Sequence, residues 1–250
     1  MNLAGKRVVI TGAAGGIGAA MARRFHAEGA SLVLSDLQAP EGLAAELDAI
    51  AVSCDVSDEA QVGKLVEVAG EIDLFCANAG IATGLGLDAG NDAWDRSWAV
   101  NVMAHVYSAR AVLPGMLARG GGYLLHTCSA AGLLISLNDA PYNVTKHAAV
   151  AFAEWLTAMY GDKGIRVSAL CPQGVRTPML MEGLEKGELA ARAVAAAGAI
   201  LEPEEVAEFV VQGLAEERFL ILPHPEVAMY QQRKVADPDR WLAGVRRLIR

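Results

Sequence analysis

The sequence predicts an α/β fold, a doubly wound sheet of seven parallel strands with helices on both faces. Three observations favour it. Short β-branched runs alternate along the chain with longer segments of helical apolar spacing, which is typical of β-α-β units. A glycine-rich turn follows the first short run. Polar residues follow several of the other runs, at the strand ends where such a sheet binds its ligands.

The first strand is expected at Lys6–Thr11, where four consecutive β-branched residues suit a strand buried on both faces. Further short apolar runs predict strands at 31–35, 49–54, 72–77, 122–128, 166–171 and 219–222. Between them, apolar residues at helical spacing predict helices at 19–28, 58–69, 94–118, 141–160 and 203–215. The alternation of these elements predicts the doubly wound topology.

Residues 1–250 are expected to form a single domain, although a length of 250 residues would also allow two. The alanine-rich stretch 189–200 has glycines around it and is the expected exception to regular structure. We interpret residues 176–200 as a lid over a substrate, with an ordinary surface helix as the alternative. Residues 223–250 then form a short C-terminal extension.

The composition is that of a cytoplasmic globular protein. Hydrophobic residues make up 53% of the chain and its mean hydropathy is +0.29, enough for a large core and for subunit contacts. The net charge of −8 gives no electrostatic support for a nucleic-acid partner. No apolar stretch reaches the roughly 18 residues of a membrane span. The first strand begins too early to leave room for a signal peptide.

The cysteines and histidines indicate no metal site. Each of the four cysteines lies at or near a predicted strand end, and none is part of a C-x-x-C motif. We therefore expect Cys54, Cys76, Cys128 and Cys171 to be reduced and mostly buried. The five histidines form no ligand motif such as H-E-x-x-H. Neither a structural nor a catalytic metal is expected.

The glycine-rich turn Gly12–Gly18 lies between the first strand and the first helix. Glycines there let the backbone approach a pyrophosphate, and the start of the helix offers free N–H groups and the positive end of its dipole. The spacing G-x3-G-x-G departs from the usual G-x-G-x-x-G dinucleotide fingerprint. We interpret the turn as a cofactor site because of its position, with tight strand–helix packing as the alternative.

Asp36 ends the second strand, about twenty residues beyond the glycines. A carboxylate there accepts hydrogen bonds from both adenine-ribose hydroxyls and repels a 2′-phosphate. Neither Gly15 nor Leu37, both placed to meet such a phosphate, is basic. The sequence therefore predicts NAD rather than NADP, and the alternative is a solvated aspartate at a strand end.

Tyr142 and Lys146 are four residues apart in an expected helix, so their side chains share a face. A phenol has a pKa of about 10, and a cation beside it lowers that pKa towards the range of a useful proton donor or acceptor. Alone, this spacing is common and also fits an exposed helical pair. Ser129, thirteen residues earlier, and the glycine turn favour a catalytic role.

Together, these features resemble the compact type of the short-chain dehydrogenase/reductase family over nearly the whole chain. Thr11–Gly18 is similar to the family's T-G-x3-G-x-G segment, and Asn78–Gly80 to its N-A-G segment. Pro172–Thr177 resembles its P-G-x-V-x-T segment. The order and spacing of four residues resemble those of the family's four catalytic residues: Asn101, Ser129, Tyr142 and Lys146.

The resemblance implies a Rossmann-type domain that binds NAD and transfers hydride between NAD and a secondary alcohol or ketone. It implies that Tyr142 transfers the proton and that Ser129 hydrogen-bonds the substrate oxygen. Lys146 would lower the tyrosine pKa and hold the nicotinamide ribose. Asn101 would anchor a water beside Lys146, with a helix-kink or capping role as the alternative. Asp55 would contact the adenine amino group. The implied cofactor-binding residues are Gly12, Gly16, Ile17, Gly18, Asp36, Asp55, Val56, Asn78, Ala79, Gly80, Tyr142, Lys146, Pro172, Val175 and Thr177.

Two residues depart from the family pattern. Ala77 replaces an asparagine often found before the N-A-G segment, and Gln173 replaces the glycine after Pro172. The carboxamide of Gln173 is expected to face the nicotinamide or the substrate carbonyl, or else to turn outward and cap a backbone group. The candidate substrate residues are Leu133, Leu137, Gln173 and Met179, which predict a largely apolar pocket for a small-molecule alcohol or ketone.

Other functions were weighed against this one. An NAD-binding sensor or scaffold would be expected to lack the tyrosine, the lysine or the glycine turn, and all are present. An epimerase or dehydratase of the extended type needs a larger C-terminal domain than residues 223–250, and an enoyl reductase spaces its tyrosine and lysine more widely. The resemblance and the apolar faces of helices 94–118 and 141–160 predict a homotetramer, with a dimer as the fallback.

Overall fold

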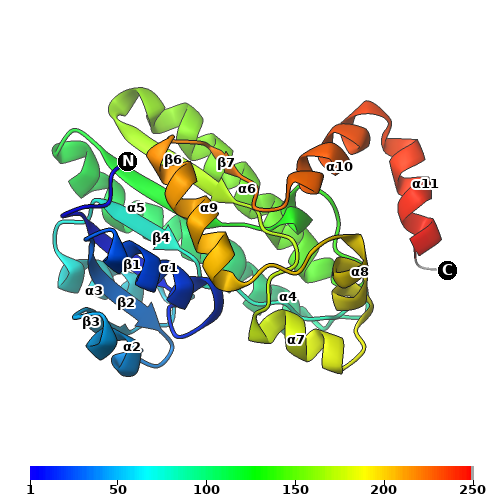
Figure 1. Ribbon diagram of the computed structural model, residues 1–250, viewed down its shortest axis with the longest axis horizontal. Coiled ribbons are helices and arrows are strands. Elements are labelled where there is room, and N and C mark those ends of the chain that lie inside the picture. The colour runs from blue at the N-terminus through cyan, green and yellow to red at the C-terminus, as the bar shows by residue number, and fades with distance from the viewer. Residues whose placement is uncertain (249–250) are drawn as a thin grey trace.

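The computed structural model describes residues 1–248, and within them the predicted seven-stranded parallel sheet is confirmed (Figure 1). Its strands are β1 (Arg7–Thr11), β2 (Ser31–Asp36), β3 (Ile50–Ser53), β4 (Leu74–Ala77), β5 (Gly122–Thr127), β6 (Ile165–Leu170) and β7 (Leu220–Ile221). The strand order is β3-β2-β1-β4-β5-β6-β7. The order therefore reverses between β1 and β4, which is where a doubly wound sheet opens a crevice for a ligand.

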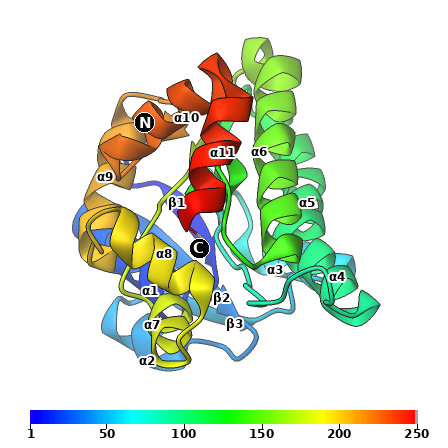
Figure 2. The ribbon, with the colours of Figure 1, turned by 90° about the vertical axis from the view of Figure 1, so that its right-hand side faces the viewer.

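Helices cover both faces of the sheet. In the described residues they are α1 (Gly16–Ala27), α2 (Glu41–Glu46), α3 (Glu59–Ala69), α4 (Asn91–Trp98), α5 (Ala104–Ala118), α6 (Ala140–Tyr160), α7 (Pro178–Glu185), α8 (Leu189–Ala197), α9 (Pro203–Ala215), α10 (Pro225–Ala236) and α11 (Pro238–Leu248). Figure 2 shows α1 and α9 on one side of the sheet and α5 and α6 on the other. Helices α10 and α11 extend from the body beyond β7 (Figure 1).

The sheet is buried on both faces because successive strand side chains point to opposite sides. Val9, Phe75 and Leu124 belong to the core under α3, α5 and α6, and all are fully buried. Ile10 and Leu125 belong to the core on the α1 and α9 face. Burying one such side chain contributes roughly 1.5–3 kcal/mol, so the two clusters together fix the strand register and the position of every strand end.

Recognisable sequence signals begin several helices. The Asp58 carboxylate caps α3 by accepting hydrogen bonds from the N–H groups of Ala60 and Gln61. Glu202 and Glu205 form a capping box at the start of α9. Helices α7, α9, α10 and α11 each begin at a proline, the residue whose missing N–H costs least at the first helical position.

The helix predicted over 94–118 is not one regular α-helix. α4 ends at Trp98, a π-helical segment covers Ala99–Met103, and α5 then continues to Ala118. The extra residue in the π turn rotates Asn101 into the protein, where its amide bonds the backbone of Ile81 on both sides. Asn101 thus lies in an irregular turn of the helix, as the kink alternative expects, and its role beside Lys146 stays a prediction.

The alanine-rich stretch predicted to lack regular structure forms α8, so that prediction was wrong. Alanine has the highest helix propensity, and the helix runs from Leu189 until Gly198. Helices α7 and α8 form one excursion from the body. Its ends are joined where Arg176 N–H donates to Leu201 O and Leu201 N–H donates to Gly174 O, both at 2.9 Å. The lid role of this excursion stays a prediction.

Candidate active site

The glycine turn between β1 and α1 leaves no room for side chains at Gly12 and Gly18. A Cβ on Gly18 would lie 2.1 Å from the carbonyl oxygen of Gly12, and a Cβ on Gly12 would lie 2.9 Å from Cα of Ala79. Gly12 and Gly16 also have positive φ angles of 65° and 53°, which glycine adopts without strain. Gly15 supplies no side-chain cap to α1. The first N–H groups of the helix are thus offered to an anion, so the turn fits a pyrophosphate.

Asp36 lies at the carboxyl end of β2 and lines the pocket beside this turn. Its carboxylate accepts hydrogen bonds from the N–H groups of Ala14 (3.0 Å) and Leu37 (2.8 Å). These bonds hold the carboxylate against the glycine turn. Leu37, the next residue, is 57% exposed. Because its side chain is uncharged, it presents no cation to this part of the pocket.

Asn78 has a structural role that the sequence did not reveal. Its side-chain amide donates to Thr11 O at 3.0 Å and accepts from the Thr127 hydroxyl at 3.0 Å. The Thr11 hydroxyl accepts from the N–H groups of Asn78 and Ala79. Asn78 therefore braces the ends of β1, β4 and β5, the three central strands, and holds the pocket floor in place.

Asp55 also uses its carboxylate locally, accepting from the N–H and the hydroxyl of Ser57. Its backbone N–H is taken by the side-chain oxygen of Gln61. Asp55 and Val56 both line the pocket. They therefore occupy the expected wall beyond β3, and the adenine contact stays a prediction.

Tyr142, Ser129 and Lys146 line the same pocket, and Asp139 fixes the start of the helix that carries two of them. The buried Asp139 carboxylate caps α6 by accepting from Tyr142 N–H. It also accepts from the N–H and hydroxyl of Thr83 and from Gly84 N–H. Asp139 thus ties the loop after β4 to the first turn of α6, and the position of Tyr142 follows from that bond.

Lys146 is buried, with 3% of its surface exposed. Its Nζ donates to Thr127 O at 3.0 Å and lies 5.6 Å from the centroid of the Tyr142 ring. Burial lowers the pKa of this ammonium because the charged form loses solvation. Asn101 lies next to it: both its Oδ1 and Nζ of Lys146 would be 3.2 Å from a Cβ placed on Gly80.

Desolvation raises the pKa of the Tyr142 phenol to about 12, and the neighbouring Ser129 hydroxyl acts in the opposite direction. The sequence predicted that Lys146 would bring this pKa down. In the structure the ammonium donates to the Thr127 carbonyl and sits beside the ring, and its effect on the tyrosine pKa stays a prediction. With a pKa of about 12, the phenol is protonated at neutral pH.

The pocket has a volume of about 1440 Å³, above the roughly 300–1,000 Å³ of an ordinary small-ligand site. Most of the predicted residues line it: Gly12, Gly16, Ile17, Asp36, Asp55, Val56, Asn78, Ala79, Gly80, Ser129, Leu137, Tyr142, Lys146, Pro172, Gln173, Val175, Thr177 and Met179. Gly18 and Asn101 are buried behind it and support its wall. Leu133 was assigned wrongly to the substrate: it packs into the core under α6.

Gln173 lies at the pocket, and the contact of its carboxamide with the nicotinamide or the substrate carbonyl stays a prediction. It lines the pocket, and its side-chain oxygen is buried with no hydrogen-bond partner among residues 1–248. The backbone around it is held from both sides, since Pro172 O accepts from Ala130 N–H at 2.8 Å. An unpaired buried oxygen costs free energy, and a small rotation of the side chain would be needed to bring this oxygen to a ligand.

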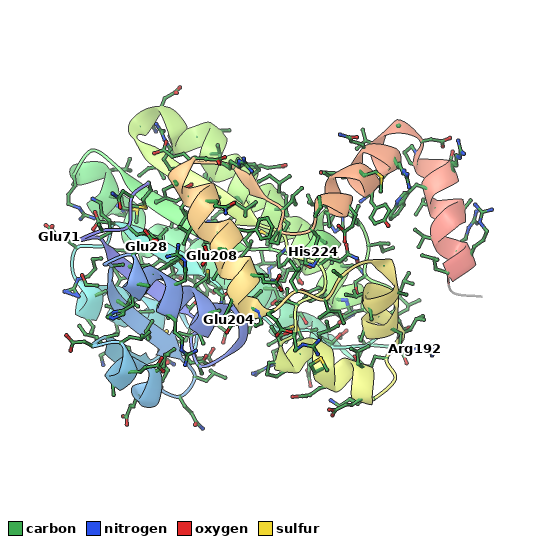
Figure 3. The ribbon with its side chains drawn as sticks, in the orientation of Figure 1. Glu28, Glu71, Arg192, Glu204, Glu208 and His224 are labelled. Atoms are coloured by element: carbon green, nitrogen blue, oxygen red, sulfur yellow. The ribbon has the colours of Figure 1, made fainter. Side chains whose placement is uncertain are left out.

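His224 is a structural residue behind the site that sequence reasoning missed. It precedes α10 (Figure 3) and is 2% exposed. Its Nδ1 accepts from Gln173 N–H at 3.1 Å, so Nε2 carries the proton and donates to Gly174 O at 3.0 Å. His224 thereby clamps the segment after β6 to the start of the C-terminal helices. A lone histidine 51 residues from its partners carries no sequence signal for this role.

None of the helices within 1–248 is long and apolar enough to cross a membrane. Across the same residues, no cluster of three or more histidine, cysteine, aspartate or glutamate side chains is arranged to hold a metal ion. The four cysteines are free and buried, as the sequence predicted.

Comparison with known proteins places this geometry in a family. A family model described as short chain dehydrogenase matches residues 6–188. The chain is 36% identical over 241 residues to the 1-deoxy-11-beta-hydroxypentalenate dehydrogenase of Streptomyces exfoliatus, covering 90% of this chain and 86% of that enzyme. It is 39% identical over 184 residues to the 2-keto-3-deoxy-L-fuconate dehydrogenase of Xanthomonas campestris pv. campestris, covering 72% of this chain and 61% of that enzyme.

Among solved structures, a short chain dehydrogenase/reductase from Burkholderia phymatum in complex with NAD superposes with a TM-score of 0.85 at 30% identity, covering 96% of both chains. The match extends over the glycine turn, the strand ends and the helix that carries Tyr142 and Lys146. The relatives named above are dehydrogenases of hydroxy or keto compounds. This chain belongs to the short-chain dehydrogenase/reductase family and is an oxidoreductase of that family.

Proposed function

We propose that this protein is an NAD-dependent oxidoreductase that interconverts a secondary alcohol and a ketone, with Tyr142 as the proton-transferring group. One observation carries the proposal. The phenol of Tyr142, the hydroxyl of Ser129 and the ammonium of Lys146 line a single pocket with the glycine turn and Asp36. A reacting carbon and a dinucleotide therefore have room beside each other in one site.

NAD, when bound, accepts the hydride from the carbinol carbon and brings a positive ring into the pocket. The residues of this chain handle the proton and the oxygen. Ser129 directs its hydroxyl towards the substrate oxygen and stabilises it as an alkoxide develops. Tyr142, protonated at neutral pH, donates its proton to a carbonyl during reduction and takes it back from the alcohol during oxidation.

Lys146 acts through position rather than by titrating. Its buried ammonium is fixed to Thr127 O, which leaves further N–H donors for the nicotinamide ribose hydroxyls. Asn101 and Thr145 stabilise the adjacent helix, since the Asn101 amide donates to the Thr145 hydroxyl at 3.1 Å. The predicted water at Asn101 would complete the path from Lys146 to solvent.

NAD is favoured over NADP because Asp36 holds a carboxylate where the adenine ribose is expected. A 2′-phosphate would meet this negative charge, and neither Gly15 nor the exposed Leu37 offers a compensating cation. The NAD complex of the similar Burkholderia phymatum protein supports this choice.

The similar enzymes narrow the substrate search. The names pentalenate and fuconate denote carboxylates, one on a hydroxy compound and the other on a keto compound. On the basis of these names, hydroxy acids and keto acids are the first substrate class to assay for this chain. Leu137 and Met179 line its pocket with apolar side chains, so an apolar carbon skeleton should fit there.

The alternative function is a catalytically weak NAD-binding sensor on the same fold. In the sensor, cofactor binding would be retained and turnover would be minimal.

The deciding experiment follows cofactor absorbance with a panel of secondary alcohols, hydroxy acids and their ketones, using both NAD and NADP. Tyr142→Phe removes only the phenolic oxygen, so it should lower kcat by about 10²–10⁴ while NADH affinity stays within about twofold. Ser129→Ala should lower kcat as well. Retention of most of the activity in Tyr142→Phe would rule out this residue as the acid/base, and absence of turnover with intact NADH binding would favour the sensor.

A homotetramer is proposed as the assembly. Trp98 (45% exposed), Trp155 (51%) and Met159 (50%) leave large apolar surfaces of α4 and α6 uncovered in one chain, and such surfaces mark contacts between proteins. Light scattering should give a mass near four times 26.2 kDa. A monomer mass at micromolar concentration would contradict the assembly, and the cytoplasmic location stays a prediction.

A further inference from the structure

The last two helices form the outer wall of the pocket. α10 and α11 are joined at Asp237, and Figure 2 shows α11 between α8 and α6. None of the residues of α11 is buried. Its pocket-facing side is nevertheless defined, because Arg240, Trp241, Gly244, Val245, Arg247 and Leu248 line the pocket at helical spacing, while Leu242 and Arg246 do not.

The arginines on this wall have no acidic partner. Arg240 and Arg247 of α11 and Arg233 of α10 line the pocket, and no ion pair joins any of them to a carboxylate within residues 1–248. Other arginines of the chain are paired, such as Arg166 with Glu217 at 2.7 Å. The chain as a whole has a net charge of −8, whereas these three unpaired arginines make the charge of this wall positive.

Among residues 1–248, five acidic residues line the pocket. Glu188, at the start of α8, has its carboxylate beside Gly84 and Gly183, and the other four accept hydrogen bonds from backbone N–H groups. The Asp139 carboxylate accepts bonds from Thr83, Gly84 and Tyr142. The carboxylate of Asp237 accepts from Arg240 N–H at the start of α11. Asp36 and Asp55 line the opposite part of the pocket, beyond β2 and β3. A negative group entering from the α11 side therefore meets mainly positive charge.

Between this wall and the reacting groups the pocket is apolar. Trp241 and Val245 face it from α11, and Ala190, Ala193 and Val194 face it from α8. Arg192, on the same helix, also lines the pocket and points away from the sheet on the side of the molecule where α11 lies (Figure 3). An occupant that spans this region has an apolar body with a charged end.

The wall is anchored to the body. Lys234 of α10 donates from Nζ to the carbonyls of Leu133 (2.8 Å) and Leu134 (3.0 Å) and lies 5.6 Å from the Trp241 ring. His224 fixes the start of α10 to Gln173 and Gly174. The arginines are therefore presented at a defined position relative to Ser129 and Tyr142, even though α11 buries no residue itself.

We propose that Arg240 and Arg247, assisted by Arg233, bind the anionic group of an amphipathic substrate whose hydroxyl or carbonyl reacts at Ser129 and Tyr142. The anionic group is a carboxylate or a phosphate, because the planar guanidinium fork suits both. The apolar body lies between α8 and α11. This inference rests on the proposed function and identifies the part of the pocket that selects the substrate class.

The test measures binding without turnover. NADH-saturated protein is titrated calorimetrically with decanoate, decyl phosphate and decanol, which share one apolar chain and differ in the end group. Decanoate or decyl phosphate should bind at least about tenfold more tightly than decanol, and the difference should shrink as salt screens the charges. The tighter of the two identifies the anionic group.

Neighbouring arginines provide a matched control. The double variant R240Q/R247Q should weaken anion binding by about tenfold and leave decanol affinity within about twofold. Arg247→Gln alone should weaken anion binding by a smaller factor, whereas Arg246→Gln removes one charge from the outward side of α11 and should change neither affinity. Because none of these residues is buried, thermal melting of the variants should match the unmodified protein.

Equal affinity for decanol and both anions would overturn the inference, as would a loss in Arg246→Gln equal to that in Arg247→Gln. Absence of anion binding at millimolar concentration would overturn it too. If NADH itself does not bind, the same titration on the protein alone gives the answer. Anion preference without hydride transfer to any substrate would leave the arginine site standing and refute the proposed function.

Discussion

The two ends of the long pocket are built in different ways. At the nucleotide end, formed by the glycine turn, Asp36 and Asn78, backbone groups and short polar side chains bond one another across the ends of the central strands. At the substrate end, formed by α7, α8, α10 and α11, the helices bury few residues and α11 buries none. The nucleotide end is therefore part of the buried core, whereas the substrate end consists of helices that pack on the outside of that core and bury little of their own surface.

This difference indicates in which part of the pocket the chain tolerates amino-acid substitutions. A common cofactor requires one geometry, and that geometry is fixed by contacts that also hold β1, β4 and β5 together. A substrate differs from one relative to the next, and its site is made of helices connected to the body at a few points such as His224 and Lys234. Substitutions should therefore damage the nucleotide end more than the substrate end.

The largest effect is expected at Gly18. A Cβ there would lie 2.1 Å from Gly12 O, so Gly18→Ala forces the turn open and should weaken NADH binding by at least about 100-fold, or ~2.7 kcal/mol. Gly15→Ala is the matched control, because nothing lies within 4 Å of its Cβ. Calorimetric titration with NADH measures both. Similar affinities in the two variants would show that the turn is not rigid.

The second prediction concerns the core that both ends share. Burial lowers the pKa of His126 from 6.5 to about 4, while the unfolded chain protonates near the ordinary value. The unfolded state therefore binds more protons as the pH falls through this window. Stability should be complete above about pH 6.5 and decline towards pH 4, by up to roughly 3 kcal/mol.

Urea unfolding of the unmodified protein and His126→Leu across that pH range checks this effect. The variant lacks the titrating group, so its pH-dependent loss should be smaller whatever its stability at neutral pH. His105 lies 2.8 Å from His126, and burial lowers its pKa as well, so part of the loss should persist. Identical pH profiles would exclude His126 as a cause.

The third prediction changes cofactor choice at the nucleotide end. The unmodified protein should prefer NAD to NADP by at least about tenfold in kcat/KM, equivalent to ~1.4 kcal/mol. Asp36→Ala with Leu37→Arg removes the repelling charge and adds a cation, so it should narrow or reverse the preference. Steady-state kinetics with both cofactors decide the matter, and equal kcat/KM in the unmodified protein would contradict the role of Asp36.

The fourth prediction moves to the substrate end. The unpaired side-chain oxygen of Gln173 should accept a hydrogen bond from a second hydroxyl near the reacting carbon. Gln173→Gly should then lower kcat/KM for a hydroxy-ketone or diol by about fivefold, ~1 kcal/mol, and spare a plain secondary alcohol. Equal losses for both substrates would make Gln173 a structural residue.

The smallest effect on stability is expected from removing residues 238–250. Because α11 buries no residue, the truncated protein should melt within about 2 °C of the full chain and bind NADH unchanged, since 1 kcal/mol corresponds to roughly 2–4 °C at this size. The KM for its substrate should rise, because one wall of the pocket is lost. A large fall in melting temperature would show that the substrate end stabilises the core, against the comparison drawn above.

The same division explains what the sequence could predict. The strands were found because β-branched runs such as Val8–Ile10 are a local signal of a buried strand. The glycine turn, Ser129 and Tyr142 were found because their spacing is tied to those strands. Helices α10 and α11 were not expected, although each begins at a proline that is a usable local signal for a helix start.

Other features depend on distant contacts and leave no local pattern. The π turn at Asn101 exists because the Ile81 backbone, twenty residues away, accepts and donates to its amide. Lys146 was placed correctly on the face of Tyr142, but the Thr127 carbonyl decides where its ammonium goes. Leu133 was assigned to the pocket on hydrophobicity alone, which cannot separate a core leucine from a substrate contact.

The bridge between Val175 and Leu201 has a consequence for how such a chain diversifies. The segment that contains α7 and α8 leaves the body near Val175 and returns at Leu201, where backbone hydrogen bonds join its two ends. It is therefore a closed excursion whose ends lie side by side. Changing the length of a closed loop costs little, about 0.6 kcal/mol for each doubling. Insertions, deletions or exchanges between residues 177 and 200 can therefore reshape the pocket mouth while Ser129 and Tyr142 keep their positions.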